Sequence, residues 1–202
     1  MSLKSALETL AGVDKDIARA YEICGLPPKR TRKPGFAGLV HIITAQQVSA
    51  HAARAIIGRL NDAVRPLAPE GFLELTGADF KAIGLSRQKV SYGRALAEDV
   101  LSGRINLRTI RRMEDEDAIA HLTQAKGIGR WSAEVYLLFA LKRPDIWPVD
   151  DLAVRMAVMK LKRLRKAPSK KRMDAIARPW RPHRSAAARF LWHYYHHPGV
   201  PD

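Results

Sequence analysis

The sequence predicts an all-α fold, and two observations carry that prediction. Apolar residues recur with the three- and four-residue spacing of an amphipathic helix along most of the 202 residues. No long stretch alternates apolar and polar residues with the two-residue period of a strand. Glycine and proline residues punctuate the helical stretches. We therefore expect short helices joined by turns, in one domain or two intimate halves.

The expected helices follow the chain in order, and their boundaries come from caps and breakers. Ser2 and Asp14 are N-caps, and Gly12 separates the first two helices. The segment from Gly25 to Gly35 is rich in proline and basic residues and cannot be regular. The expected helical ranges are 2–10, 14–24, 36–60 with a break near Gln46 and Gln47, 71–83 in two pieces, 86–101, 114–122, 132–141, and a helix after Asp151 that runs to Leu161.

The charge balance indicates a polyanionic partner. The formal net charge is +15 and the pI is about 10.4, which favours nucleic acid first and an acidic membrane surface second. Lys160–Arg184 holds eleven basic residues and one acid, which indicates either a DNA-facing stripe or a solvated segment. No apolar run has the length of a membrane span, and the N-terminus lacks the apolar core of a signal peptide. We expect a monomeric intracellular protein, in the cytoplasm or nucleoid if bacterial.

The most informative stretch is Leu122–Asp151, LTQAKGIGRWSAEVYLLFALKRPDIWPVDD. It reads as a short helix, a tight turn, an apolar helix, a loop and an acidic pair. Gly127 and Gly129 bracket the turn, where we expect glycine to be needed to avoid strain. The backbone N–H groups of these glycines and their neighbours then point outward, unpaired, at a helix N-terminus. Such a terminus binds anions, and phosphate is the natural anion for a basic chain.

The sequence K-G-I-G-R-W between apolar helices, followed by P-V-D-D, resembles the helix-hairpin-helix DNA glycosylase superfamily. Within that superfamily the chain is similar to the 3-methyladenine DNA glycosylase II type, over about Phe36–Trp192. The resemblance implies a single helical glycosylase domain over residues 1–202, with the hairpin at about 118–141. It also implies two helical halves with the active site in the cleft between them, and no extra N-terminal β domain.

The resemblance implies a monofunctional DNA glycosylase of base excision repair. Such an enzyme flips an alkylated purine, such as 3-methyladenine or 7-methylguanine, out of double-stranded DNA and hydrolyses its N-glycosidic bond, which leaves an abasic site. Members that also cut the strand carry a lysine nucleophile at the position of Trp131, so no lyase activity is expected. The transition state resembles an oxocarbenium cation, which an aspartate stabilises.

Two aspartates compete for the catalytic role. The P-V-D form and the spacing from Gly129 to Asp150 match the 8-oxoguanine members of the superfamily. An ungapped count against the 3-methyladenine members selects Asp151 instead. We favour Asp150, with Asp151 as a helix cap or partner, and keep the alternative open.

The resemblance and the residues together name further site positions. The expected base pocket consists of Trp131, Trp147 and Trp192, although a tryptophan can equally serve as core. The expected DNA contacts are Gly127, Ile128, Gly129, Arg130, Ser132, Gln46, Gln47, Ser86 and Lys89. Either Gln46 or Gln47 matches the residue that fills the gap left by a flipped base, although a polar turn is the alternative. Ser86 and Lys89 open a helix where a second phosphate could dock, or they are part of a capped surface helix.

No cofactor is expected to be required. The resemblance implies a structural Na⁺ or K⁺ held by main-chain carbonyls of Thr123, Ala125 and Ile128. The single cysteine, Cys24, excludes an internal disulfide and a four-cysteine iron–sulfur cluster. Two rival functions stay open: a non-catalytic helix-hairpin-helix DNA-binding protein, and a glycosylase for oxidised or deaminated bases.

Overall fold

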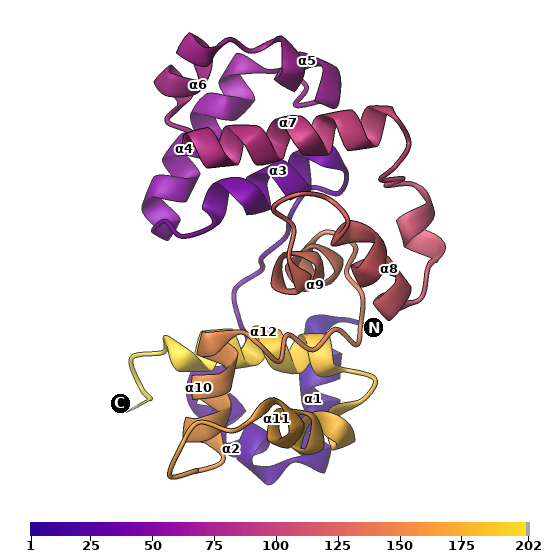
Figure 1. Ribbon diagram of the computed structural model, residues 1–202. Helices are drawn as coiled ribbons and strands as arrows, with labels where there is room; N and C mark the ends of the chain where they lie inside the picture. Colours follow the sequence, from indigo (N-terminus) through magenta and orange to yellow (C-terminus); the bar gives the residue numbers. More distant parts are fainter. Residues whose placement is uncertain (201–202) are drawn as a thin grey trace. The chain divides into compact units, whose positions relative to one another are not determined.

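The computed structural model describes residues 1–200, and every regular element among them is helical (Figure 1), which confirms the all-α prediction. The α-helices are α1 (Leu3–Val13), α2 (Lys15–Cys24), α3 (Phe36–Ala45), α4 (Ala50–Ala63), α5 (Pro69–Glu74), α6 (Gly77–Ile83), α7 (Arg87–Leu101), α8 (Asp115–Leu122), α9 (Arg130–Phe139), α10 (Leu152–Leu161), α11 (Lys170–Ala177) and α12 (Arg184–Tyr195). The 3₁₀ turns are η1 (Thr109–Arg112) and η2 (Arg178–Trp180). None of these helices is long and apolar enough to cross a membrane.

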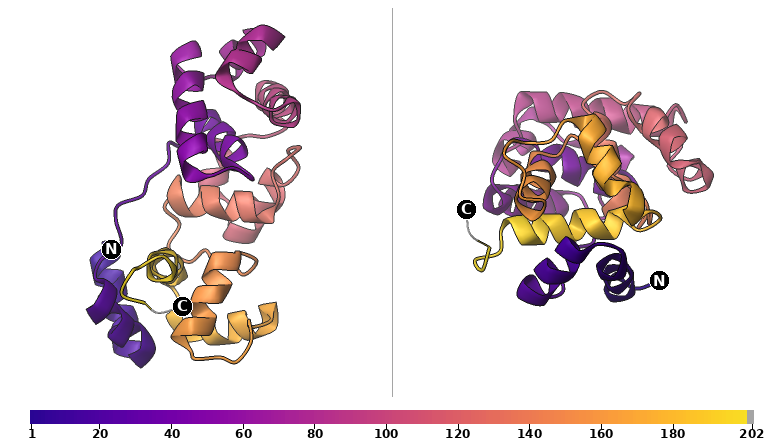
Figure 2. Two further views of the ribbon diagram at one scale, coloured as in Figure 1. Left: turned by 90° about the vertical axis from the view of Figure 1, so that its left-hand side faces the viewer. Right: turned by 90° about the horizontal axis from the view of Figure 1, so that it is seen from below.

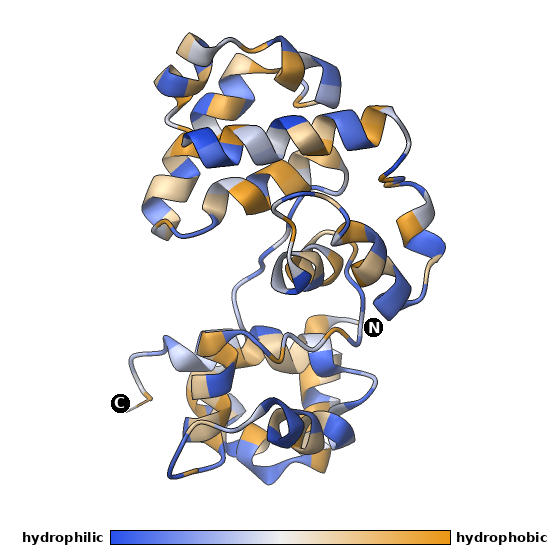
Figure 3. Cartoon of the chain, in the orientation of Figure 1, coloured by the Kyte–Doolittle hydropathy of each residue, from blue (hydrophilic) through white to orange (hydrophobic). Residues whose placement is uncertain are grey.

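The chain divides into two compact units. Unit 1 contains Met1–Arg30 and the chain from Lys142 onward, and unit 2 contains Thr31–Leu141. In unit 1, helices α1 and α2 from the start of the chain pack against α10 and α12 from its end (Figures 1 and 2). In unit 2, α3 packs against α4, α7 and α9, and α5 packs against α7. Hydrophobic and hydrophilic residues interleave along these helices, as amphipathic packing requires (Figure 3).

The core of unit 1 is organised around the carboxylate of Asp14. Asp14 is the N-cap of α2, where its Oδ1 accepts from the N–H of Asp16 at 3.0 Å. The carboxylate also accepts from Nζ of Lys162 at 2.7 Å and from Nε1 of the buried Trp180 at 2.8 Å. Burial by itself would raise the pKa of the Asp14 carboxyl, but the hydrogen bonds from Lys162 and Trp180 outweigh it and hold the pKa below its ordinary value.

Unit 2 is organised around α7, which its neighbours approach closely. The ring of Phe72, on α5, fills the space where a Cβ on Gly93 would stand, 2.5 Å from the nearest ring atom. Phe72 also packs edge-on against Phe36, with ring centroids 5.8 Å apart. The segment that enters the unit is tied to α9, because the N–H of Gly35 donates to the buried hydroxyl of Tyr136 at 2.8 Å.

Most predicted boundaries are confirmed, and the exceptions have local causes. The N-caps at Ser2 and Asp14 are present, and a loop interrupts 36–60 after Ala45. Gly12 does not separate helices, because α1 continues to Val13 and the Asp14 cap makes the break. Helix α11, which the sequence did not separate from its basic surroundings, buries only Met173 and Ala177 and begins with three basic residues.

Replacing Asp14 should destabilise unit 1 in a pH-dependent way. Asp14→Asn keeps an N-cap but removes the charge that faces Lys162. We expect a loss of about 2–3 kcal/mol at pH 7, below the usual cost of breaking a buried pair because Asp16 still contacts Lys162 at 2.9 Å. Urea unfolding followed by tryptophan fluorescence measures the difference.

The sign of the pH effect follows from the depressed pKa. The contribution of Asp14 is complete above the ordinary carboxyl pKa of about 4 and is lost as pH falls through the lower pKa of the folded state. The stability gap between wild type and Asp14→Asn should therefore close in acid. A gap that stays constant down to complete protonation would contradict this account.

Candidate functional site

The hairpin turn between α8 and α9 depends on one glycine more than on the other. Gly127 has φ +84°, a left-handed conformation that favours glycine, and a Cβ there would lie 2.3 Å from the ring of Tyr92. Gly129 has φ −84° and ψ 173°, and a Cβ there would meet nothing within 4 Å. The expectation that glycine is needed at both positions is therefore right for Gly127 and wrong for Gly129, whose backbone any residue can adopt.

The turn presents donors to an external anion. Among residues 1–200, nothing accepts a hydrogen bond from the N–H of Gly127 or Gly129. The N–H of Ile128 differs from the expectation, because it donates to the carbonyl of Ala125 at 3.1 Å and is used within the turn. Gly129 is the N-cap of the ten-residue α9 and supplies no side-chain cap, so the positive end of that helix is open to a ligand.

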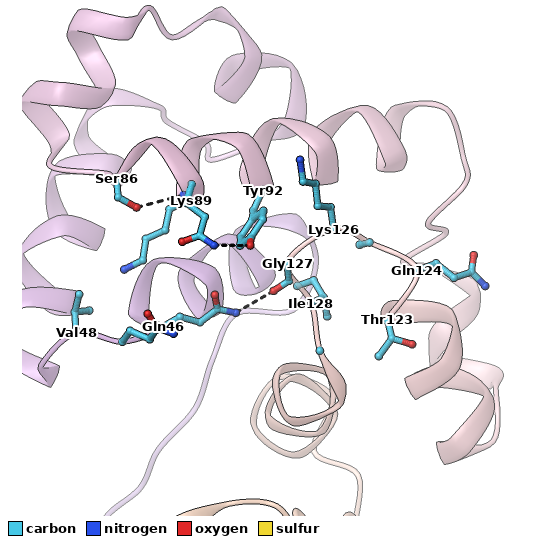
Figure 4. Close-up of a pocket in the computed structure, with 14 residues that line it drawn as sticks. Gln46, Val48, Ser86, Lys89, Tyr92, Thr123, Gln124, Lys126, Gly127 and Ile128 are labelled. Atoms are coloured by element: carbon cyan, nitrogen blue, oxygen red, sulfur yellow. Dashed lines mark hydrogen bonds between the residues drawn. The ribbon is translucent and has the colours of Figure 1, made fainter.

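The structure brings the hairpin turn together with both polar segments that the sequence selected in unit 2. Gln46 and Gln47 follow α3, and Ser86 and Lys89 open α7 (Figure 4). They line one groove with a volume of about 660 Å³. The lining residues are Gln46, Gln47, Val48, Ser86, Gln88, Lys89, Tyr92, Thr123, Gln124, Ala125, Lys126, Gly127, Ile128 and Gly129.

Five lining residues were missed from the sequence, which are Val48, Gln88, Tyr92, Gln124 and Lys126. Tyr92 lies on α7 three residues after Lys89, so helical spacing could have placed it on the same face. Lys126 lies in the turn itself and is exposed. It donates from Nζ to the hydroxyl of Ser91 at 3.3 Å.

Ser86 and Lys89 are fixed by the protein. The hydroxyl of Ser86 accepts from the N–H of Lys89 at 3.4 Å, which confirms Ser86 as the N-cap of α7. The ammonium of Lys89 donates to the carbonyl of Thr44, in the last turn of α3, at 2.7 Å. Burial lowers the pKa of the Lys89 amine. Lys89 thus joins α7 to the end of α3 and places positive charge in the groove.

Gln46 and Gln47 differ although they are neighbours. Gln46 is half-buried and donates from Nε2 to the carbonyl of Gly127 at 3.0 Å and to the hydroxyl of Ser132 at 3.2 Å. Gln47 is exposed and has φ +54°, which is uncommon for a residue other than glycine. Gln47 is therefore the tip of the loop, and Gln46 ties that loop to the hairpin.

Arg130 and Ser132 have partners inside unit 2. Arg130 donates from both terminal nitrogens to Glu116, at 2.7 and 2.8 Å, and from Nε to the buried Glu134 at 2.9 Å. Its hydrogen bond with Glu116, and the charges of both glutamates, raise the pKa of the guanidinium further above its ordinary value. Ser132 is buried and accepts from Gln46. Their side chains stabilise α9, and Ile128 is likewise buried.

The two aspartates of unit 1 lie in different environments. Asp151 is 8% exposed and is the N-cap of α10, where its Oδ1 accepts from the N–H of Val154 at 2.9 Å. The same oxygen accepts from Nε1 of Trp192 at 3.0 Å. The side chain of Asp150 is 37% exposed and pairs with Nζ of Lys170 at 2.7 Å. Asp151 is thus held rigidly, while Asp150 takes part in a surface ion pair.

The three predicted pocket tryptophans differ in exposure. Trp131, in the first turn of α9, is 39% exposed. Trp192 is half-buried and is oriented by its bond to Asp151. Trp147 is buried in unit 1, edge-on to Trp180 with ring centroids 5.5 Å apart, so it serves as core in this structure.

The three residues expected to hold a cation belong to the hairpin turn and the end of the preceding helix. Thr123, Ala125 and Ile128 all line the groove. The carbonyls of Thr123 and Ile128 accept no hydrogen bond from residues 1–200, while that of Ala125 accepts from Ile128. Two of the three oxygens are thus available to a hard cation, which fits the expected donor set. No cluster of histidine, cysteine and acidic side chains that could hold a metal occurs within the described residues.

The fold and the groove define a class of protein. Its members are all-helical, and their hairpin turn offers main-chain N–H groups to an anion such as phosphate. A family profile described as "HhH-GPD superfamily base excision DNA repair protein" matches residues 40–182. The chain therefore belongs to the HhH-GPD superfamily of base excision DNA repair proteins.

Individual relatives cover nearly the whole chain. It is 34% identical over 199 residues to DNA-3-methyladenine glycosylase 1 of Schizosaccharomyces pombe, covering 95% of this chain and 87% of that protein. The structure of an S. pombe 3-methyladenine DNA glycosylase in complex with abasic DNA matches with a TM-score of 0.83 and 32% identity, covering 93% of this chain and 95% of that one. DNA-3-methyladenine glycosidase of Bacillus halodurans matches with a TM-score of 0.82 and 30% identity, covering 95% and 89%.

Gly129 allows a clean test of the anion site, because a Cβ there meets no protein atom within 4 Å. Gly129→Asp adds a negative charge beside the open N–H groups, and Gly129→Asn is its neutral match. Both residues are good N-caps, so neither should destabilise α9. We expect Gly129→Asp to lose roughly tenfold or more in affinity for any duplex, damaged or not, beyond the loss in Gly129→Asn, which is ~1.4 kcal/mol or more.

Fluorescence anisotropy with an undamaged duplex gives the measurement, and thermal unfolding confirms that both variants are folded. Equal affinities of the folded aspartate and asparagine variants would show that no phosphate lies at this turn.

Proposed function

We propose that this chain is a monofunctional DNA glycosylase that removes alkylated purines, such as 3-methyladenine and 7-methylguanine, from double-stranded DNA. Its family membership and its similarity to 3-methyladenine DNA glycosylases over nearly the full length support this proposal. The observation that carries the chemistry is the buried, doubly hydrogen-bonded carboxylate of Asp151 at the N-terminus of α10.

Asp151 suits the catalytic role better than Asp150, which the sequence favoured. An electrostatic stabiliser works when it is fixed in place and shielded from water before the reaction begins. Asp151 meets both conditions through Val154 and Trp192. Asp150 is more exposed and is paired with a lysine that is 68% exposed. We therefore assign stabilisation of the oxocarbenium-like sugar to Asp151 and the ion pair with Lys170 to Asp150.

The groove of unit 2 would hold the DNA strand. The N–H groups of Gly127 and Gly129 would bind phosphate at the positive end of α9. A Na⁺ or K⁺ on the carbonyls of Thr123, Ala125 and Ile128 would add positive charge at the same turn. Gln47, exposed at the tip of its loop, would fill the gap in the duplex when the damaged nucleotide leaves the stack.

Trp131 bears on both substrate and product. It stands where strand-cutting relatives carry a lysine, so no Schiff base with the sugar can form at that position. Its exposed ring offers an electron-rich face, and bases alkylated at ring nitrogen carry positive charge, so cation–π attraction favours them. Such bases are also good leaving groups, which removes the need for a general acid. In unit 1, the bond from Trp192 to Asp151 supports a role for the Trp192 ring in contacting the base.

An excision assay tests the proposed function. The substrates are methylated, oxidised and uracil-containing duplexes, each analysed with and without alkali and with borohydride. We expect release of methylated purine, strand breaks only after alkali, and no trapped covalent adduct, because Trp131 replaces the nucleophilic lysine.

The rival functions predict different results in the same assay. Excision of the oxidised base or uracil instead would identify a glycosylase of different specificity. Binding without any excision would identify a DNA-binding protein that lacks catalysis. A borohydride-trapped adduct would overturn the monofunctional assignment.

Asp151→Asn isolates the catalytic charge, since asparagine caps a helix as well as aspartate does and can still accept from Trp192. Removal of one well-placed electrostatic group costs about 10²–10³ in rate, roughly 2.7–4 kcal/mol, with stability nearly unchanged. Asp150→Asn is the matched control and should keep most of its activity, because an exposed ion pair contributes little.

Single-turnover release of 3-methyladenine by both variants is the measurement. An inactive Asp150→Asn beside an active Asp151→Asn would return the role to Asp150. Full activity in both would exclude this acidic pair from the mechanism.

A further inference from the structure

The side chain of Gln46 joins two parts of the groove that are distant in sequence. Its Nε2 donates to the carbonyl of Gly127 at 3.0 Å (Figure 4). The same nitrogen donates to the hydroxyl of Ser132 at 3.2 Å. A carbonyl oxygen only accepts hydrogen bonds, so the nitrogen end of the amide must face the hairpin. Both N–H groups of Gln46 are therefore directed at α9 and its preceding turn, which leaves neither for DNA.

The neighbouring Gln47 has a backbone that its surroundings must enforce. Its φ of +54° lies in the left-handed region, which a residue with a Cβ holds only where the structure around it determines the conformation. On one side Gln46 is tied to the hairpin. On the other side Ser49 caps α4 by accepting from the N–H of Ala52 at 3.2 Å. The loop is thus fixed at both ends, with Gln47 exposed between them.

A third contact holds the base of the loop. The ammonium of Lys89 donates to the carbonyl of Thr44, two residues before Gln46, at 2.7 Å. The end of α3 is therefore bound by α7 through Lys89 and by the hairpin through Gln46. Because the Gln46 bond reaches the carbonyl of Gly127, it holds the same turn whose free N–H groups face the groove.

We propose that Gln46 is a positioning residue for base flipping, which fixes the exposed Gln47 relative to the phosphate-binding turn. A DNA strand held at Gly127 and Gly129 then meets Gln47 at a fixed distance. Insertion of the Gln47 side chain therefore has no entropic cost from ordering the loop. This inference rests on the proposed function, because Gln47 has a gap to fill only if a nucleotide leaves the stack. Gln46 acts through its neighbour and touches no reacting atom.

Gln46→Met tests the proposal, because methionine has a similar length and no donor. The matched control is Asn61→Leu, which removes the 3.0 Å contact between Asn61 Oδ1 and His41 Nε2 that joins α4 to α3 in the same unit. Three quantities are compared with wild type: affinity for an undamaged duplex, fluorescence of a 2-aminopurine beside an abasic-site analogue, and the single-turnover rate of 3-methyladenine release.

We expect Gln46→Met to bind undamaged duplex as wild type does but to lose roughly tenfold or more in excision rate, the scale of a small misplacement, with a matching fall in the fluorescence change. Asn61→Leu should leave all three quantities unchanged.

A double variant tests whether Gln46 acts through Gln47. Gln47→Ala should also lose excision activity, and adding Gln46→Met to it should cause no further loss, because one residue acts through the other. If Gln46→Met does not fold, Gln46→Asn keeps an amide that is one methylene too short.

Three results would overturn the proposal: additive losses in the double variant, an equal loss in Asn61→Leu, or unimpaired flipping in a folded Gln46 variant. Wild-type protein that neither flips nor excises would remove the proposed function and this inference together. An active wild type beside an equally active Gln46 variant would remove the inference alone.

Discussion

The close approach of the hairpin turn to Tyr92 fixes the position of that turn in unit 2. Gly127 lies so near the ring that a Cβ would be 2.3 Å from it. Tyr92 lies on α7, and the ring of Phe72 packs over Gly93 of the same helix. A glycine therefore permits each of these two close contacts with α7. Helix α7 also begins at the Ser86 cap and carries Lys89, which binds the end of α3. The hairpin turn and the loop after α3 are therefore both positioned by contacts with α7. Packing, rather than the turn alone, thus sets the direction of the free N–H groups.

The strongly basic composition acts over longer distances than the groups of the candidate site do. Arg130 is bound by Glu116 and Glu134, and Lys89 is bound to a carbonyl, so these two cations near the turn also stabilise the fold. The net charge of +15 supplies the long-range, salt-sensitive attraction to a polyanion. Under the proposed function, the closest contacts at the turn are made by backbone N–H groups, whose position the fold fixes. A side-chain cation adapts to many anions, whereas fixed N–H groups select where a phosphate must lie.

The sequence predicted the fold class, most helix boundaries and nine of the fourteen residues that line the groove, because helical spacing, caps and glycine act locally. The missing details depend on tertiary neighbours. The need for glycine at position 127 but not at 129 depends on Tyr92, which lies on another helix. The difference between Gln46 and Gln47 depends on a bond that spans 81 residues. Helix α11 was obscured because it buries only Met173 and Ala177 and lies within a basic run.

The N-termini of α9 and α10 are capped in opposite ways, and that difference supports the proposed choice of Asp151 over Asp150. A helix N-terminus favours negative charge. At α9 the N-cap is Gly129, which has no side chain, so the N-terminus of that helix stays open to an external anion. At α10 the cap is Asp151, which fills that place with its own carboxylate. Asp150, one residue earlier, lies outside the cap and finds its counter-charge in Lys170.

A carboxylate that opposes a developing cation must keep its charge and its position throughout the reaction. The N-cap geometry of α10 supplies both for Asp151, because the helix dipole stabilises the charge and the bonds from Val154 and Trp192 fix the oxygen. The matching sequence P-V-D-D contains both candidates at almost equal spacing from the hairpin. Only the start of the helix distinguishes them, and that boundary is where a sequence pattern is least informative.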